Sequence, residues 1–254
     1  MTGIITAAYI SAAILFILAL GGLSDQERAK RAIWYGVFGM ALAMLATAFS
    51  LFSGPISLES IPNIEILLAV IAVGAVAGLI VAFRVQMTGM PQLVAILHSF
   101  VGLAAVFIGL NADIVLNEVS GLPASPEITG FAARLAEKDS VEIMILKVEV
   151  LLGIFIGAIT FTGSVVAYGK LAGLISGLPR QLPGGHILNL IMAVLCVVLG
   201  AMYLAGSDIW TIIVIAVIAG LIGWHLIMGI GGADMPVVVS MLNSYSGWAA
   251  AAIG

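Results

Sequence analysis

The chain has 254 residues, of which 62% are hydrophobic and only 9% are charged, and its mean hydropathy is +1.24. An ordinary soluble domain carries about 25% charged residues, so this composition excludes the soluble class and indicates an integral membrane protein. The net charge of −4 is spread over the connecting segments, which argues against a nucleic-acid-binding protein.

Apolar stretches recur along the whole chain and are long enough, at about 20 residues each, to cross the hydrocarbon core of a bilayer as helices. The alternating pattern of a transmembrane β-barrel is absent. The sequence therefore predicts an all-α integral membrane protein, a bundle of about eight transmembrane helices in a single domain over residues 1–254. The eight stretches are 3–22, 33–52, 64–83, 92–110, 148–168, 187–206, 209–228 and 236–254.

The first stretch lacks a basic segment before its apolar run, so it predicts a membrane helix and not a signal peptide. Basic residues predict the orientation of the bundle, because they favour cytoplasmic loops. Six of the nine lie in the odd-numbered loops, which are therefore predicted to be cytoplasmic, with both ends of this chain outside. These six are Arg28, Lys30, Arg31, Arg84, Lys170 and Arg180, whereas Arg134, Lys138 and Lys147 lie in the fourth loop.

Small residues at a spacing of four indicate close helix packing in two of the stretches. Gly74 and Gly78 form one such pair and Gly153 and Gly157 another. Helices in lipid are held by close backbone approach and by hydrogen bonds between helices, so these glycines predict contact surfaces. The hydroxyl groups that follow Gly157 leave two interpretations open: they line a hydrated internal path, or they bond back to their own helix. These hydroxyl residues are Thr160, Thr162 and Ser164.

The fourth stretch places a histidine on a face of small residues. That face is formed by Pro91, Ala95, His98, Gly102, Ala105 and Gly109, which step by three or four residues. A narrow face of this kind is predicted to turn inward, and no Asp, Glu, Lys or Arg occupies the middle of any predicted span. His98 is thus the deepest side chain whose ordinary titration falls between pH 5 and 8. Such a residue is a functional candidate, and the alternative is a neutral ring bonded to a packing neighbour.

The connection before 148, about 111–147, is the only long loop that the sequence predicts. Its segment Glu127–Lys138 is predicted to form a short amphipathic helix that lies across the mouth of the bundle. Loops of this kind mostly cover other elements, so we assign it no further role.

The last stretch begins with a flexible turn that contains Gly231, Gly232 and Asp234. The helix that follows carries Ser240, Asn243, Ser244 and Gly247 on one face. An amide in an apolar span needs a partner or water beside it, so this helix is predicted to have other helices around it. At 1.5 Å per residue, Asn243 lies about 10 Å past Pro236 and His98 about 9 Å past Gln92, which predicts a shared level in the bundle.

Several kinds of catalytic site are not indicated. No phosphate-binding glycine loop is followed by a lysine, and no Cys/His spacing fits a metal site or a catalytic triad. The glycines around Asp234 do not follow a β-strand, so they do not predict a dinucleotide fingerprint. We therefore predict no metal site and no residues for covalent catalysis in this chain.

Four runs of sequence, spread from one end of the chain to the other, carry a family resemblance. They are Thr6–Phe16, Met90–Ala105, Leu152–Leu171 and Gly231–Ala251. They resemble the membrane part of the β subunit of proton-translocating NAD(P) transhydrogenase. The family subunit continues through one more helix and a soluble NADP-binding domain, so the resemblance implies that this chain stops before both. The family often has an acid where this chain has Gln92.

The resemblance implies an enzyme in which NADH reduces NADP⁺ by hydride transfer between two peripheral domains while a proton crosses the membrane domain inward. His98 and Asn243 would belong to the proton pathway, and we expect Ser240 and Ser244 to assist them. Asp234 would lie where the NADP-binding domain docks. Gly231 and Gly232 would form a joint there, although a simple tight turn is the alternative. Gly102, Gly153, Gly157 and Gly247 are expected to serve helix packing.

The implied partners are the transhydrogenase α subunit or subunits, the NADP-binding domain and a second copy of the complex, in a bacterial inner membrane. NAD and NADP would bind in the partner domains and no cofactor in this chain. The main alternative is an independent secondary transporter or channel with a histidine-based proton site. Such transporters often contain internal repeats, and we find none between residues 1–110 and 148–254. A purely structural membrane anchor would leave His98 unexplained.

Overall fold

The computed structural model describes residues 2–23, 27–53, 64–119, 132, 135–136, 138–180, 184–206 and 208–253. Within these ranges the chain forms eight α-helices, which confirms the predicted all-α class. They are α1 (Thr2–Leu23), α2 (Ala29–Ser53), α3 (Ile64–Arg84), α4 (Met90–Val119), α6 (Ser140–Leu171), α7 (Gly185–Leu204), α8 (Trp210–Met228) and α9 (Met235–Ile253). Two short 3₁₀ turns, η2 (Met87–Gly89) and η3 (Gly232–Asp234), precede α4 and α9.

Seven of the described helices, α1 to α8, are long and apolar enough to cross a membrane, and the chain is an integral membrane protein. The 19-residue helix α9 is not among the seven. Its polar residues lower its hydropathy, and these are Ser240, Asn243, Ser244 and Ser246. The spanning role of α9 therefore stays a prediction.

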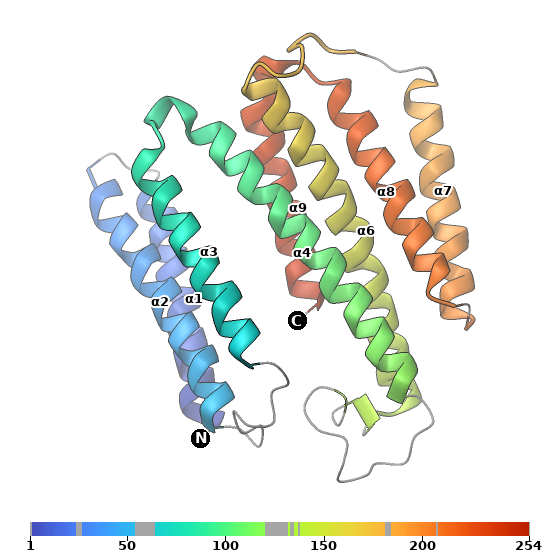
Figure 1. The fold of residues 1–254 in the computed structure, drawn as a ribbon, viewed down its shortest axis with the longest axis horizontal. Helices are drawn as coiled ribbons and strands as arrows, with labels where there is room; N and C mark the ends of the chain where they lie inside the picture. Colours follow the sequence, from blue (N-terminus) through green and yellow to red (C-terminus); the bar gives the residue numbers. More distant parts are fainter. Residues whose placement is uncertain are drawn as a thin grey trace. The chain divides into compact units, whose positions relative to one another are not determined.

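The helices divide into two compact units, of which the first contains α1, α2 and α3 as far as Val76. Helices α1 and α2 pack antiparallel, and small residues let them approach closely. A β-carbon on Gly39 would lie only 3.2 Å from the carbonyl oxygen of Ala12. One polar contact joins them, 2.9 Å between Tyr9 Oη and Thr47 Oγ1. Both helices are visible in blue in Figure 1.

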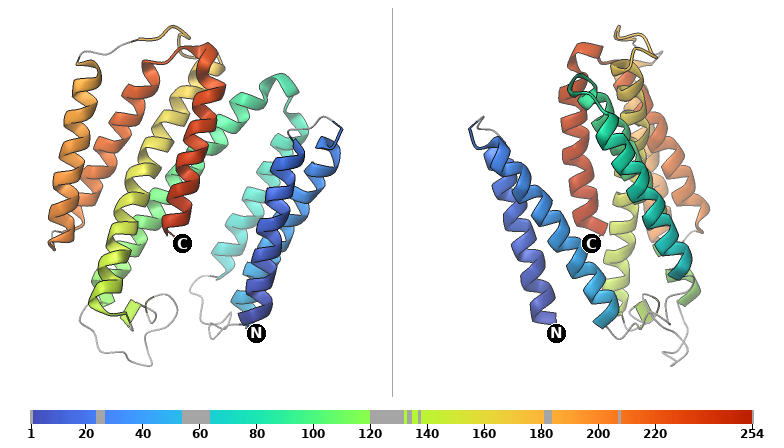
Figure 2. Two further views of the ribbon diagram at one scale, coloured as in Figure 1. Left: turned by 180° about the vertical axis from the view of Figure 1, so that it is seen from behind. Right: turned by 60° about the vertical axis from the view of Figure 1, so that its left-hand side comes forward.

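The second unit begins at Ala77 and contains α4, α6, α7, α8 and α9. Helix α6 is its centre, because α4, α8 and α9 all pack against it, whereas α7 packs mainly on α8 (Figure 2). One buried apolar cluster lies where Ala95, Val166 and Leu242 meet, and a second lies where Ala112, Ile154 and Ile212 meet. We name the two ends of this unit after residues that lie near them. At the Lys170 end, α6 and α8 finish and α9 begins; at the Asp113 end, α6 and α8 begin.

The predicted long loop over 111–147 is wrong on both sides. Helix α4 continues to Val119 and α6 already begins at Ser140. Asp139 caps α6, since its side chain accepts from Val141 N at 2.9 Å and Glu142 N at 2.8 Å. Glu142 in turn accepts from Asp139 N at 3.1 Å, which completes a capping box. The predicted amphipathic helix Glu127–Lys138 lies mostly outside the described residues.

Candidate functional site

His98 is buried in the second unit, with 6% of its surface exposed, as its small-residue face predicts. Its Nε2 atom lies 2.9 Å from the hydroxyl oxygen of Ser246 on α9. The same hydroxyl group donates to the carbonyl oxygen of Asn243 at 3.0 Å. A serine hydroxyl has a single hydrogen. While Ser246 donates to Asn243, its oxygen therefore accepts from an Nε2–H of His98.

The backbones of α4 and α6 touch beside His98. A β-carbon on Gly102 would lie 2.6 Å from both the carbonyl oxygen of Gly157 and the amide nitrogen of Phe161, so only glycine fits at 102. Gly157 itself faces the carbonyl oxygen of Gly102 in the same way, at 2.8 Å. Gly153 is buried one turn away on α6. This close approach holds His98 at a fixed distance from α6.

Two buried hydroxyl groups of α6 occupy the neighbourhood of His98. Thr160 and Ser164 are both 0% exposed, and neither hydroxyl oxygen has a hydrogen-bond partner among the described residues. Gly102 lies against Thr160, and Ala95 shares a cluster with Val166, so the antiparallel helices place Ser164 near the level of His98. Buried hydroxyl groups without protein partners are sites where water binds.

The face of α9 that the sequence singled out lies on the outside of this unit. Ser240, Asn243, Ser244 and Gly247 are all exposed, and nothing lies within 4 Å of a β-carbon on Gly247. The buried face consists of Met235, Val238, Val239, Leu242, Ser246 and Ala249. Asn243 therefore reaches His98 through its backbone carbonyl and Ser246, whereas its side-chain amide is free for partners outside the described residues.

Sequence reasoning missed Ser246. A signal was available, because Val239, Leu242, Ser246 and Ala249 step by three, four and three residues along one helix face. The other face of the same helix carries more polar residues, Ser240, Asn243 and Ser244, and was therefore the stronger signal.

A buried ammonium group organises the Lys170 end. Lys170 is 5% exposed, and its Nζ atom donates to the carbonyl oxygens of Ile227 at 3.2 Å, Met228 at 2.8 Å and Ile230 at 2.6 Å. Those carbonyls lie at and just beyond the C-terminus of α8, where a positive charge also complements the helix dipole. Lys170 thus ties α6 to the start of the turn that contains Asp234.

The same turn is tied to the connection between α6 and α7. Gly232 N donates to the carbonyl oxygen of Gly177 at 2.8 Å, and Arg180 N donates to that of Met228 at 3.0 Å. A β-carbon on Gly232 would lie 3.1 Å from the Cα atom of Gly177, so a side chain at 232 would crowd the Gly177 backbone. Asp234 is exposed just before α9 begins, and Gly231 lies beside it. At this end Gln92 also donates to the carbonyl oxygen of Leu171, at 3.0 Å.

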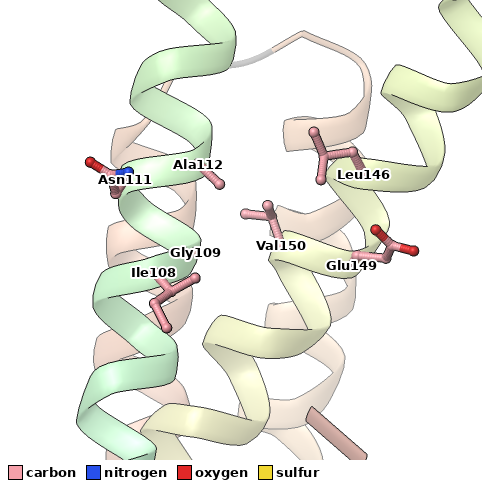
Figure 3. A pocket seen from close by; sticks show the side chains of 7 residues that line it. All are labelled: Ile108, Gly109, Asn111, Ala112, Leu146, Glu149 and Val150. Atoms are coloured by element: carbon pink, nitrogen blue, oxygen red, sulfur yellow. The ribbon is translucent and has the colours of Figure 1, made fainter. Parts of the chain in front are cut away.

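Two small pockets of this unit are lined in part by polar residues. One, of about 290 Å³, lies between α4 and α6. In Figure 3, Ala112, Leu146 and Val150 point into the space between the helices, whereas the polar groups of Asn111 and Glu149 point away from it. This pocket therefore presents an apolar interior.

The other pocket, of about 240 Å³, lies at the Lys170 end and is lined in part by His186, Asn189 and His225. His225 is buried, and neither of its ring nitrogens has a hydrogen-bond partner among the described residues. Within the described ranges, no group of three or more His, Cys, Asp or Glu side chains could hold a metal ion.

Comparison with known proteins gives a consistent result. Residues 5–254 match the family described as NAD(P) transhydrogenase beta subunit. Two curated relatives, one from Rhodospirillum rubrum and one from a named strain of that species, are called NAD(P) transhydrogenase subunit beta. Each is 44% identical to the chain over 249 residues, which cover 98% of this chain and 48% of the relative. The chain thus spans about half the length of these relatives.

Proposed function

Because this chain belongs to the NAD(P) transhydrogenase beta subunit family, we propose that residues 1–254 are the proton-translocating membrane domain of such an enzyme. Inward passage of a proton through this domain is coupled to hydride transfer from NADH to NADP⁺. The hydride-transfer site and both nucleotides belong to partner domains and not to this chain. The partners are the α subunit or subunits and the NADP-binding domain, in a homodimeric complex of a bacterial inner membrane.

The observation that carries this proposal is the hydrogen-bonded sequence from His98 through Ser246 to the Asn243 carbonyl. When His98 holds a proton on both ring nitrogens, Nε2–H donates to Ser246, which keeps its own bond to Asn243. When Nε2 has lost its proton, Ser246 must turn to donate to the ring, and the Asn243 carbonyl loses its donor. The protonation state of His98 is therefore linked to the hydrogen bonding of α9.

Helix α9 extends this link toward the nucleotide domain. Ser246 lies twelve residues after Asp234, which is about 18 Å along a helix. The turn at the start of α9 is held by Lys170 and by the Gly232–Gly177 contact. We propose that the NADP-binding domain docks at Asp234, with Gly231 and Gly232 as the joint. A change of state in that domain then favours one arrangement of α9, and α9 in turn favours one hydrogen-bonding state of His98. This link is the coupling that the enzyme needs.

Water and partner helices complete the proposed pathway. The hydroxyl groups of Thr160 and Ser164 are buried near His98 and have no described hydrogen-bond partner, so they would hold water beside the ring. On the other side of α9, the polar groups of Ser240, Asn243 and Ser244 are exposed in this chain. Helices from outside the described residues would cover them and extend the pathway there.

The test is a comparison of wild type with His98→Ala in the complete complex, rebuilt in liposomes with the nucleotide domains. Hydride transfer from NADH to NADP⁺ and dye-reported proton movement are measured together. The matched control is Ser99→Ala, because Ser99 is equally buried but bonds back to Ile96 of its own helix at 2.7 Å.

We expect His98→Ala to lose coupled hydride transfer and proton movement with the complex still assembled, and Ser99→Ala to retain both. Full proton coupling in His98→Ala would mean that His98 is only a packed core histidine, and it would overturn the proposal. Proton conductance by this chain alone, independent of any nucleotide, would instead favour an independent channel with a histidine-based proton site.

A further inference from the structure

We propose that Asp113, together with Tyr203, forms a proton-binding site at the Asp113 end of the second unit. A proton would rest on the Asp113 carboxyl group in exchange with the outer solvent and supply the pathway through His98. This inference rests on the proposed function, because it assumes that the unit conducts protons.

The two side chains form a closely bonded pair inside the protein. Asp113 is 0% exposed and Tyr203 is 1% exposed. The hydroxyl group of Tyr203 on α7 donates to Asp113 Oδ1 at 2.6 Å. The amide of Asn117 on α4 donates to Asp113 Oδ2 at 3.0 Å. Each carboxyl oxygen therefore has its own donor, and the two donors lie on different helices.

The surroundings of the pair are largely apolar. Tyr203 belongs to a buried cluster that also contains Ala112, Val150 and Ile212. Among the described residues no ion pair with Asp113 forms, and the facing cation is Lys147, whose Nζ lies 5.6 Å from the centre of the Tyr203 ring. Burial disfavours the charged carboxylate, whereas the hydrogen bonds from Tyr203 and Asn117 favour it, so this place can hold either charge state. Ionisable residues inside membrane helices mark proton relays for this reason.

The two hydrogen-bond donors of Asp113 differ in their access to solvent. Oδ2 is bonded to Asn117, which is exposed, and α4 ends six residues after Asp113, about 9 Å farther along. Oδ1 is bonded to the buried hydroxyl group of Tyr203. A proton from outer water therefore reaches the carboxylate at Oδ2, where an O–H bond forms and the charge falls from −1 to 0. Release of the proton reverses this step.

The position along α4 agrees with a site that precedes His98. Asp113 lies fifteen residues after His98, about 22 Å along the helix. Between their levels α6 contributes the buried Thr160 hydroxyl group, which has no described partner. Of the other described acids near this end, Glu118, Asp139, Glu142 and Asp208 are exposed, and Glu149 is only partly buried, with its carboxylate pointing away from α4 in Figure 3. Among the described residues, Asp113 is thus the fully buried acid between the outer surface and His98.

The competing role for this pair is a clamp that fastens α7 to α4. The substitution Asp113→Asn separates the two roles, because an asparagine carbonyl still accepts from Tyr203 but the amide binds no proton at physiological pH. The second variant, Tyr203→Phe, keeps the acid and removes only its inner donor.

The experiment uses the complete complex in liposomes. Infrared difference spectra follow the carbonyl stretch of a protonated carboxyl group as the outer pH is changed, and a dye reports the rate of proton movement at each pH. The same measurements are made on Asp113→Asn, Tyr203→Phe and His98→Ala.

We expect a carboxyl band in wild type that titrates with the outer pH, disappears in Asp113→Asn and shifts in Tyr203→Phe. The rate should lose its dependence on outer pH in Asp113→Asn. A band and a pH profile that are the same in Asp113→Asn and wild type would overturn the inference and leave a structural clamp. If His98→Ala abolishes coupling while Asp113→Asn keeps the wild-type band and pH profile, only this inference fails. If His98→Ala retains coupling, the proposed function fails.

Discussion

The hydroxyl group of Ser246 is the contact between the buried histidine and the last helix. It lies 2.9 Å from His98 Nε2 and 3.0 Å from the Asn243 carbonyl oxygen, and it bonds to both. No other described side chain is recorded in a hydrogen bond with the His98 ring. The described hydrogen bonding of the ring therefore rests on Ser246, which makes Ser246 a more specific target for substitution than the exposed residues of α9.

At this residue we predict that Ser246→Ala slows coupled proton movement. Loss of a hydrogen bond to a buried polar group costs about 1–3 kcal/mol, which corresponds to a reduction of roughly 5-fold to 160-fold. The measurement is dye-reported proton movement in liposomes that contain the complete complex. Ser11→Ala is the control, because the Ser11 hydroxyl is exposed and bonds to Ala7 of its own helix. Equal rates in Ser246→Ala and the control would separate Ser246 from the pathway.

Residue-level prediction succeeded where the evidence was local. The small residues around His98 share its helix face, so the spacing alone predicted that the ring turns inward, and the ring is buried. Ser246 and Asp113 were not predicted as site residues, because their roles depend on partners that are distant in the sequence. The sequence separation is 148 residues between His98 and Ser246 and 90 between Asp113 and Tyr203. No periodicity along one helix reports which residues of another helix will face it.

Contact between α4 and α6 depends on two glycines, Gly102 and Gly157, and a substitution at one of them tests it. We predict that Gly102→Ala destabilises the domain, because its new β-carbon would lie 2.6 Å from backbone atoms of Gly157 and Phe161. Backbone atoms cannot rotate away, so the helices must separate, and such overpacking typically costs about 1–3 kcal/mol. Thermal unfolding of the purified protein in detergent measures the change.

Gly247→Ala is the matched control for that substitution. It adds the same methyl group to a helix, but nothing in the described chain lies within 4 Å of it. We expect its stability to be unchanged or higher by about 0.5–1 kcal/mol, because alanine favours the helix. Equal losses in the two variants would mean that the α4–α6 contact is looser than the backbone distances indicate.

At the level of elements, apolar length predicted all eight helices, but it placed two helix ends poorly. Helices α4 and α6 extend beyond their apolar stretches, to Val119 and from Ser140. The reason is that polar residues in these extensions find partners: Asn117 and Tyr203 bond to Asp113, and Asp139 with Glu142 caps α6. A prediction from hydropathy assigns such polar residues to loops, because it takes no account of the hydrogen bonds that they form in the folded protein.

Across the second unit, the Lys170 end and the Asp113 end face opposite directions, and the positive-inside rule predicts that the Lys170 end is cytoplasmic. We therefore expect Asp208→Cys, in the exposed connection after α7, to react with an impermeant thiol reagent in intact cells. Ser176→Cys, in the exposed connection after α6, should react only in inverted vesicles. Both variants are made with Cys196→Ala, which removes the buried native thiol. The reverse labelling pattern would invert the orientation and assign Asp113 to the cytoplasmic side.

The bond between Asp113 and Tyr203 also has a consequence for the order of biosynthesis. The ribosome makes Asp113 ninety residues before Tyr203, and α7 packs mainly on α8, which is made later still. Until α7 is inserted, α4 carries an acid without its hydroxyl donor, and hydrocarbon disfavours such a group. We therefore expect the newly made α4 to keep this end at the membrane surface and to reach its final depth only when α7 is inserted. The insertion of a late helix would then complete the placement of an early one.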